Sequence, residues 1–310
     1  MKKAILVLVV LAGIAAAIGW GLSAPTRMSA EEASALKEGD PAKGELVFWA
    51  GGCASCHAEK GAKGDDLLNL GGGLRLETPF GVFVAPNISS SKADGIGGWS
   101  LIDFANAMTH GTSPDGQNFY PAFPYTSYAR MTPEDLGDLY AFMATVPSVE
   151  GKAASHELGF PFNIRRGLGL WKRMFLDPAP VISQPSGDGE IDAELWERGR
   201  YLVEGPGHCG ECHTPRDFAG GLVLSDWLGG APAPTGEGRI PDITPTQGGF
   251  GSWSAADIAY YLESGFTPEY DSVGGEMVHV QENMARLPAS DRNAIAAYLK
   301  AIPTVAEPAN

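Results

Sequence analysis

The apolar positions of the chain form one long uninterrupted run and several short periodic ones. From Ala4 to Ala24 the only polar residue is Ser23, and none is charged. At about 1.5 Å per residue, this run predicts a helix long enough to cross a hydrocarbon core of about 30 Å. Residues 43–51 and 193–204 carry apolar residues three to four positions apart. This spacing predicts two amphipathic helices in the remainder of the chain.

The long apolar run is typical of an export signal, because Lys2 and Lys3 precede it. A cut after Ala24 would leave Pro25 directly beyond it, and a cut within Ala15–Ala17 would leave an exposed apolar stub. Residues 1–25 are therefore expected to be an uncleaved signal anchor, with a cleaved signal peptide as the alternative. The two lysines place the N-terminus in the cytoplasm and the rest of the chain on the periplasmic side of the membrane.

The rest of the chain contains an internal repeat. When Cys53 is placed on Cys209, the run Pro86–Ser89 matches Pro241–Thr244, and Trp99 and Trp253 follow their cysteines by 46 and 44 residues. Gly111 and Gly265 each lie twelve residues beyond the tryptophan, and both copies close on a helix-patterned segment followed by an apolar residue and proline. The repeat predicts a domain at 41–150, a linker at 151–190 and a second domain at 191–306.

Each copy is expected to be all-α. Ser100 and Ser254 are predicted N-caps, each with an aspartate three residues later, and Thr132 precedes Pro133 as a helix start does. Gly- and Pro-rich loops separate the short helices, and no strand of any length with a period of two is evident. Such a domain has little apolar core of its own, which indicates that something large and apolar fills its middle.

Charge divides the chain in the same way. The net charge is -15, which excludes a broad basic face for nucleic acid. Residues 31–150 hold 7 basic and 16 acidic side chains, residues 191–310 hold 7 and 17, and residues 151–190 hold 5 and 4. Acidic domains predict a partner with a basic face. The basic linker residues are expected to be solvated, to lie against the acidic groups of a bound cofactor, to hold the domains together with the aid of a buried Trp171 and Phe162, or to lie near the membrane surface.

All four cysteines lie in two copies of Cys-x-x-Cys-His: Cys53, Cys56 and His57, then Cys209, Cys212 and His213. Two thiols on one helical turn can reach the two vinyl groups of a haem, and the adjacent histidine can then ligate the iron, so this spacing predicts covalent haem c at both sites. A disulfide hairpin, a redox Cys-x-x-Cys and a zinc site built from both motifs are the alternatives. The zinc site would require ligands 156 residues apart to meet.

Each half resembles a class I cytochrome c domain, in which a glycine lets the first and last helices cross closely. The residues that carry this resemblance are Gly44, Phe48, Tyr140 and Phe142 in the first half and Gly199, Tyr201 and Tyr298 in the second. The runs Ala50–His57, Pro121–Tyr125 and Gly159–Arg165 resemble the cytochrome c subunits of membrane-bound alcohol and gluconate dehydrogenases. The likeness covers nearly the whole chain from residue 40. Those subunits usually carry three haems, whereas this chain has motifs for two.

The resemblance also indicates where the sixth iron ligand lies, on the loop before the last helix. Met131 is expected to ligate the first iron, with Met108 and His110 as alternatives. Met277 is expected to ligate the second iron, because Gly274–Met277 resembles related second domains, although spacing within the repeat favours Met284. The dehydrogenase subunits commonly have methionine where this chain has Phe123.

These features imply a membrane-anchored dihaem cytochrome c, which is an electron carrier and not an enzyme. It would pass single electrons from a periplasmic or membrane dehydrogenase to a cytochrome or oxidase of the respiratory chain. The alternative is a haem enzyme of the peroxidase or oxidase type, in which the iron beside Phe123 is open.

Overall fold

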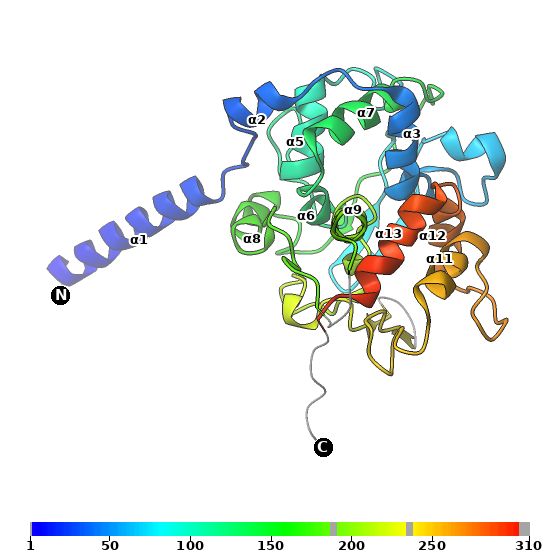
Figure 1. Ribbon diagram of the computed structural model, residues 1–310. Helices are drawn as coiled ribbons and strands as arrows, with labels where there is room; N and C mark the ends of the chain where they lie inside the picture. The colour runs from blue at the N-terminus through cyan, green and yellow to red at the C-terminus, as the bar shows by residue number, and fades with distance from the viewer. Residues whose placement is uncertain (1, 187–190, 234–237, 304–310) are drawn as a thin grey trace.

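The computed structural model describes residues 2–186, 191–233 and 238–303. The last residues of the predicted linker, 187–190, and of the predicted second domain, 304–306, lie outside the described residues. In Figure 1 a long N-terminal helix projects from a rounded body into which both halves of the repeat are folded.

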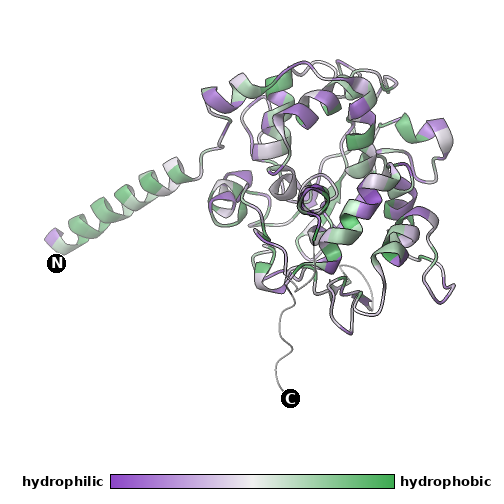
Figure 2. Cartoon of the chain, in the orientation of Figure 1, coloured by the Kyte–Doolittle hydropathy of each residue, from purple (hydrophilic) through white to green (hydrophobic). Residues whose placement is uncertain are grey.

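The projecting helix, α1 (Lys2–Leu22), buries none of its residues against the rest of the protein. In the described part of the chain it is the one helix long and apolar enough to cross a membrane. Figure 2 shows apolar residues on all of its sides, with the polar residues at its free end. A short helix, α2 (Ala30–Ala35), follows it and begins with a capping box between Ser29 and Glu32.

The first half of the body is built from short helices joined by loops. The N-caps expected at Ser100 and Thr132 are confirmed: each side chain accepts a hydrogen bond from the backbone three residues later. Ser100 and Asp103 form a full capping box. The helices of this half are α3 (Pro41–Ala50), α4 (Cys53–His57), α5 (Leu101–His110), α6 (Tyr125–Tyr128) and α7 (Pro133–Met143).

The second half has its helices in the same order. Ser254 and Asp257 form the expected capping box, and Pro288 is the N-cap of the last helix. The helices of this half are α9 (Ala193–Glu204), α10 (Gly210–His213), α11 (Ala255–Ser264), α12 (Met277–Met284) and α13 (Ala289–Lys300).

Glycine sets the closest approach of helices in both halves. A Cβ atom on Gly44 of α3 would lie 1.9 Å from the carbonyl oxygen of Asp138 in α7, and one on Gly199 of α9 would lie 1.9 Å from that of Ala294 in α13. Such distances forbid any side chain, so the prediction that glycine permits the crossing is confirmed at both positions.

Aromatic rings pack beside each crossing. In the first half Phe48 and Phe142 meet with ring centroids 5.1 Å apart, as their positions predict. In the second half Tyr298 packs on Trp196 at 5.6 Å. The hydroxyl of Tyr201, the aromatic residue expected there, instead donates to Asp135 of the first half.

The prediction that the body is entirely helical is wrong in detail, because short strands are present. Strands β1 (Arg75–Thr78), β2 (Gly81–Val84) and β3 (Glu157–Leu158) form an antiparallel sheet, and β4 (Ala231–Pro232) pairs with β5 (Arg239–Ile240). These strands are too short for a periodic pattern to reveal them, and β3 comes from the linker.

The linker also contains the helix α8 (Leu168–Phe175), which follows a single 3-10 turn, η2 (Arg165–Gly167). Two further 3-10 turns, η1 (Gly64–Leu68) and η3 (Leu224–Asp226), lie in the loops after the two cysteine motifs. These turns and the short strands are the regular structure within the loops that connect the helices.

Candidate functional site

Each Cys-x-x-Cys-His motif forms a single helical turn directly after the first long helix of its half. In the first half, Gly52 takes a left-handed conformation with φ 58° and turns the chain from α3 into α4. Cys53, Cys56 and His57 then lie on one turn. In the second half, α10 likewise follows α9 after a short loop. The two thiols and the imidazole of each motif are therefore presented together.

Both histidines are fixed by the same contact. Nδ1 of His57 lies 2.8 Å from the carbonyl oxygen of Pro86, and Nδ1 of His213 lies 2.8 Å from that of Pro241. Because a carbonyl oxygen only accepts, Nδ1 carries the proton and the lone pair of Nε2 is available for a metal. Burial lowers the pKa of both histidines, which favours the neutral imidazole that a metal requires.

The prolines that hold the histidines begin the runs matched in the repeat, Pro86–Ser89 and Pro241–Thr244. The same contact between histidine and proline carbonyl is therefore present in both copies of the repeat, and the matched runs orient the imidazoles of the motifs. The contact itself was not predicted, because a backbone carbonyl leaves no mark in the sequence.

The four cysteines are free; Cys53, Cys56 and Cys209 are half-buried and Cys212 is exposed. Burial, with a contribution from the neighbouring thiol of the motif, raises the pKa of Cys53 and of Cys209 to about 12, so both remain protonated at neutral pH. All four cysteines are unpaired, which argues against disulfide hairpins. Within the described residues no three His, Cys, Asp or Glu side chains are grouped so that they could hold a metal ion.

A narrow cavity lies beside the first cysteine of the first motif. Its walls include Cys53, Met108 and Met131, together with Tyr128 and, from the second half, Pro206. Both methionines are buried. The structure therefore brings two of the three predicted candidates for the sixth ligand to the same space.

The third candidate, His110, does not line this cavity. Its Nδ1 lies 2.8 Å from the hydroxyl of Thr109, and burial lowers its pKa, against the attraction of Glu32 in α2.

The backbone aligns the two ligand loops residue by residue at their start. The carbonyl of Gly111 accepts from the amide of Phe119 at 2.7 Å, and that of Gly265 accepts from the amide of Val273 at 2.7 Å. Four residues beyond these amides come Phe123 in one half and Met277 in the other. Phe123 therefore occupies the position of Met277.

The end of the loops can be aligned in the same way. The amide of Met131 donates to the carbonyl of Tyr128, and the amide of Leu287 donates to that of Met284. This pattern pairs Met131 with the buried core residue Leu287, and Met284 with Tyr128. This alignment contradicts the count of residues from the repeated glycine, which had matched Met131 with Met284 and so favoured Met284 as the second ligand.

The two motifs also lie against each other. Glu211, between Cys209 and Cys212, accepts hydrogen bonds from the hydroxyls of Thr126 and Ser127 of the first half, each at 3.0 Å. The same carboxylate pairs with Arg216. An acidic residue inside the second motif is thus bonded to the ligand loop of the first half.

Two further bonds join the region of the motifs to the opposite half. The amide of Asn283 donates to the hydroxyl of Ser55, between Cys53 and Cys56, at 2.9 Å. Nε2 of His208, beside Cys209, lies 3.1 Å from the carbonyl oxygen of Gly51. These contacts between the halves were not predicted from the sequence.

A buried carboxylate completes the contact between the halves. Glu204 at the end of α9 is fully buried and accepts from Tyr298 at 2.7 Å and from the amides of Val181 and Ile182 in the linker at 2.7 and 2.9 Å. Arg130 of the first half lies 3.8 Å from it. The linker and both halves therefore share one polar centre.

Comparison with known proteins agrees with this geometry. The family model for cytochrome c matches residues 41–147. A diheme cytochrome c-type protein of Cereibacter sphaeroides is 49% identical over 98% of this chain and 100% of its own length. The fructose dehydrogenase cytochrome subunit of Gluconobacter japonicus is 39% identical, and the gluconate 2-dehydrogenase cytochrome c subunit of Pantoea cypripedii is 36% identical. These matches cover 86% and 84% of this chain but only 53% and 59% of the two subunits, so the chain spans little more than half of their length.

The fold and the paired motifs define a c-type cytochrome, a protein that transfers electrons and is not itself an enzyme. The chain belongs to the cytochrome c family, and a diheme member matches it over nearly its whole length. The predictions of covalently bound haem c and of an electron-transfer role are confirmed.

Proposed function

We propose that this chain is a membrane-anchored dihaem cytochrome c that passes single electrons from a periplasmic or membrane dehydrogenase to the respiratory chain. In this proposal residues 41–150 and 191–306 are tandem class I domains joined by the linker 151–190. The observation that supports it most strongly is the identical presentation of His57 and His213, each held at 2.8 Å through Nδ1 by a proline carbonyl of the same repeated run.

The residues present fit two haem groups. Cys53 and Cys56 would bind one by thioether bonds and Cys209 and Cys212 the other, with His57 and His213 as the first axial ligands. An orphaned polar atom supports the fit in the first half: the hydroxyl of Tyr125 is buried without a hydrogen-bond partner, as expected of a group whose acceptor belongs to a cofactor.

When bound, haem supplies reversible one-electron chemistry at its iron, and the chain controls ligation, orientation and access of water. The proline carbonyls fix the tautomer and the plane of each imidazole. We assign Met131 and Met277 as the second axial ligands, because a thioether favours ferrous iron and raises the reduction potential. The buried position of Met131 beside Cys53 supports the first assignment, and the position of Met277 in its loop supports the second.

With one haem held by Cys53 and Cys56 and the other by Cys209 and Cys212, the bound groups would supply one-electron transfer between the halves, and the contacts of the chain would fix the separation of the two sites. Each attachment turn is bonded to the other half of the body: Ser55 accepts from Asn283, Glu211 accepts from Thr126 and Ser127, and Nε2 of His208 lies 3.1 Å from the carbonyl oxygen of Gly51. A charge on Cys56 would be felt at Cys212. Such fixed contacts hold two cofactors at one separation, which a flexible pair of domains would not do.

The proposed partners follow from the names of relatives and from charge. The subunits named for fructose and gluconate dehydrogenases suggest a dehydrogenase as electron donor. The acidic composition of both halves suggests a basic docking face on the partner, so salt should slow the encounter. The apolar helix α1, with Lys2 and Lys3 at its start, supports an anchor, with the body on the periplasmic side.

A second function is favoured by one observation, which is that Phe123 occupies the position of Met277 in its loop. If Met131 does not ligate the first iron, that site is open and suits a haem enzyme of the peroxidase or oxidase type. Carbon monoxide added to the ferrous protein separates the two functions. The electron-carrier proposal requires that neither haem binds it readily, whereas rapid binding with a high-spin signature at one haem would support the enzyme.

Purification in mild detergent from native membranes tests the proposed role. We expect a dehydrogenase subunit to co-purify and its substrate to reduce the cytochrome. A cytochrome that is isolated alone and is not reduced by membrane dehydrogenase substrates would contradict the role as a dehydrogenase partner.

A further inference from the structure

The linker carries a basic and apolar face that differs from the rest of the body. Residues 158–176 contain four basic residues and no acidic one, in a chain of net charge -15, and three of the four, Arg165, Arg166 and Arg173, are not buried. Five large apolar side chains of this segment are exposed. They are Phe160 (81% exposed), Phe162 (44%), Ile164 (50%), Leu170 (42%) and Met174 (67%), and they are called the linker face below.

The linker packs on the end of α1. Arg166 donates to the carbonyl of Trp20 at 2.7 Å and to the hydroxyl of Ser23 at 3.0 Å, and its guanidinium lies 4.3 Å from the centroid of the Trp20 ring. Arg173 donates to the carbonyl of Leu22 at 2.7 Å. The last carbonyls of a helix have no partner within it and carry its negative dipole end, so two arginines are well placed there.

The approach of the linker to α1 is close. A Cβ atom on Gly169 of α8 would lie 2.1 Å from the carbonyl oxygen of Ser23, so a side chain at this position would separate the two segments. Figure 1 shows α8 on the side of the body that faces α1. The position of α8 relative to the anchor is therefore specified by contacts.

The opposite side of α8 is used for packing on the body. The indole of Trp171 donates to the carbonyl of Ala219 at 2.9 Å, and the ammonium of buried Lys172 donates to the carbonyls of His110 and Gly111 at 2.6 and 2.7 Å. At 100° per residue, Leu170 and Met174 lie one turn apart on the side of α8 opposite Lys172, between Trp171 and Arg173. The exposed apolar side of α8 thus adjoins its contact with α1.

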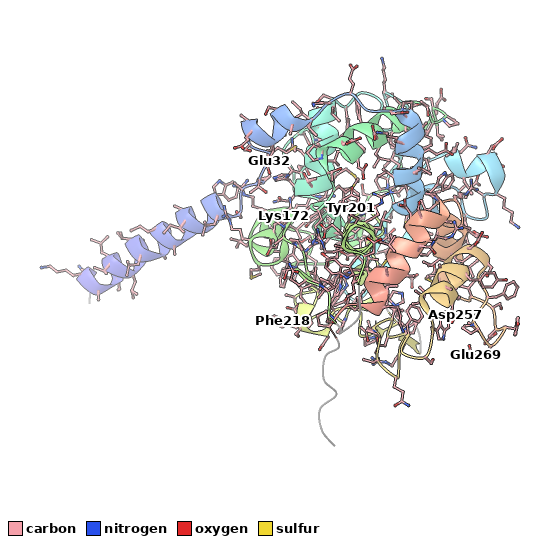
Figure 3. The ribbon with its side chains drawn as sticks, in the orientation of Figure 1. Glu32, Lys172, Tyr201, Phe218, Asp257 and Glu269 are labelled. Atoms are coloured by element: carbon pink, nitrogen blue, oxygen red, sulfur yellow. The ribbon has the colours of Figure 1, made fainter. Side chains whose placement is uncertain are left out.

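A side chain from the second half extends this side of the body. Phe218 precedes Ala219, the acceptor of the Trp171 indole, and is 97% exposed. Figure 3 shows Phe218 on the same side of the body as Lys172, below it. An aromatic ring so fully exposed has no packing role in the body itself.

We propose that the linker face lies on the surface of the lipid bilayer, at the boundary of headgroups and acyl chains, beside the point where α1 leaves the membrane. This inference rests on the proposed anchor. Basic residues next to exposed aromatic and aliphatic side chains are the composition that binds this boundary. Trp20, whose ring lies under the guanidinium of Arg166, forms with it an aromatic and basic pair of the kind found at the boundary between membrane and water.

The bilayer surface fits this face better than a protein partner does. The face is continuous with α1, whose own apolar surface is exposed over its whole length. The acidic halves are repelled by anionic headgroups, so they leave this segment as the side that approaches the membrane. Such a contact holds the body in one orientation to the bilayer, and with it the two haem sites.

Spin labels on full-length protein in vesicles of phosphatidylcholine and phosphatidylglycerol test the inference. One variant is Met174→Cys, in the linker face. The matched control is Tyr270→Cys, at a residue that is 89% exposed; Figure 3 shows its neighbour Glu269 on the side of the body away from α1. Collision with oxygen, which dissolves in lipid, is compared with collision with a water-soluble nickel chelate, and vesicle flotation after an alkaline carbonate wash is the second measurement.

We expect the label at position 174 to show a ratio of oxygen to nickel accessibility several-fold higher than the label at position 270. Equal ratios in protein that still floats with the vesicles would overturn the linker face while leaving the anchor intact. Protein that no longer floats would overturn the anchor, and the inference with it. A label at position 174 that is open to both reagents in vesicles but shielded from both in native membranes would assign the face to a protein partner and contradict the inference.

Discussion

The glycine at each helix crossing allows the tandem-domain proposal to be tested half by half. Gly199→Ala places a Cβ atom 1.9 Å from the carbonyl oxygen of Ala294 and 2.8 Å from Cβ of Tyr298. Neither neighbour is the end of a flexible side chain, so α9 and α13 must move apart. Overpacking of this kind costs about 3 kcal/mol. Alanine returns about 1 kcal/mol through its helix propensity, so the net loss is about 2 kcal/mol or more.

Thermal unfolding followed at the haem absorption bands and by calorimetry measures this loss. For a unit of this size, about 2 kcal/mol corresponds to a fall in Tm of roughly 10 °C. The control is Gly248→Ala, where no heavy atom lies within 4 Å of the added Cβ, so the change in stability should stay within about 0.5 kcal/mol.

Gly44→Ala makes the equivalent contact with Asp138 in the first half. If each half folds around its own haem, Gly44→Ala should lower haem incorporation at Cys53 and Cys56, and Gly199→Ala at the second pair. Haem-stained proteolytic fragments report each site separately. The reasoning is refuted if Gly199→Ala unfolds at the same temperature as Gly248→Ala.

Three further predictions concern the ligands, the contact between the motifs and a buried lysine. Met131→Leu introduces the residue type found at the aligned position of the second half, and it should lower the reduction potential of the first haem and allow carbon monoxide to bind there. Met277→Leu should have the same effects at the second haem. An unchanged redox titration would show that another residue is the ligand. Glu211→Ala removes two hydrogen bonds to a charged acceptor, each worth about 1.5 to 3 kcal/mol. Because these bonds position the second motif against the first half, electron exchange between the haems after flash reduction should slow. An unaltered rate would show that the carboxylate does not position the motifs. Burial lowers the pKa of Lys172 from its usual value near 10.5 to about 7, so the unfolded chain binds more protons between these values and stability should rise by roughly 2 to 4 kcal/mol as the pH rises through this window. Urea unfolding at several pH values should show this slope in the natural protein and lose it in Lys172→Met, and parallel profiles would contradict it.

The sequence predicted the features that repeat. Two motifs in register, matched proline runs and caps at Ser100 and Ser254 each depend on neighbours a few residues apart, so they leave a local pattern. The glycines of the helix crossings were found by resemblance to a known fold, and the structure gives their physical reason in the 1.9 Å distances to facing carbonyls.

Contacts between the halves left no such pattern. Ser55 and Asn283 are 228 positions apart. Nothing in the sequence around Ser55 indicates that its hydroxyl is bonded to Asn283. The short strands were missed because four residues or fewer cannot show a period. Phe162 was expected to be buried between the domains and is 44% exposed, because its ring packs only on the first half, against Phe80 at 5.0 Å.

The half-buried Trp171 does hold the halves together, as one interpretation of the linker predicted. Its indole donates to Ala219 of the second half, and its ring lies 6.4 Å from that of Tyr125 in the first. Composition alone could not distinguish it from Phe162, since both are aromatic residues in the same basic segment.

An optical redox titration of the full-length protein tests the central proposal most directly. Two haem sites that are each ligated on both sides predict two reversible one-electron waves of equal amplitude in the c-type absorption band. A single wave, unequal amplitudes or an iron that cannot be reversibly reduced would contradict the account of this chain as a dihaem electron carrier.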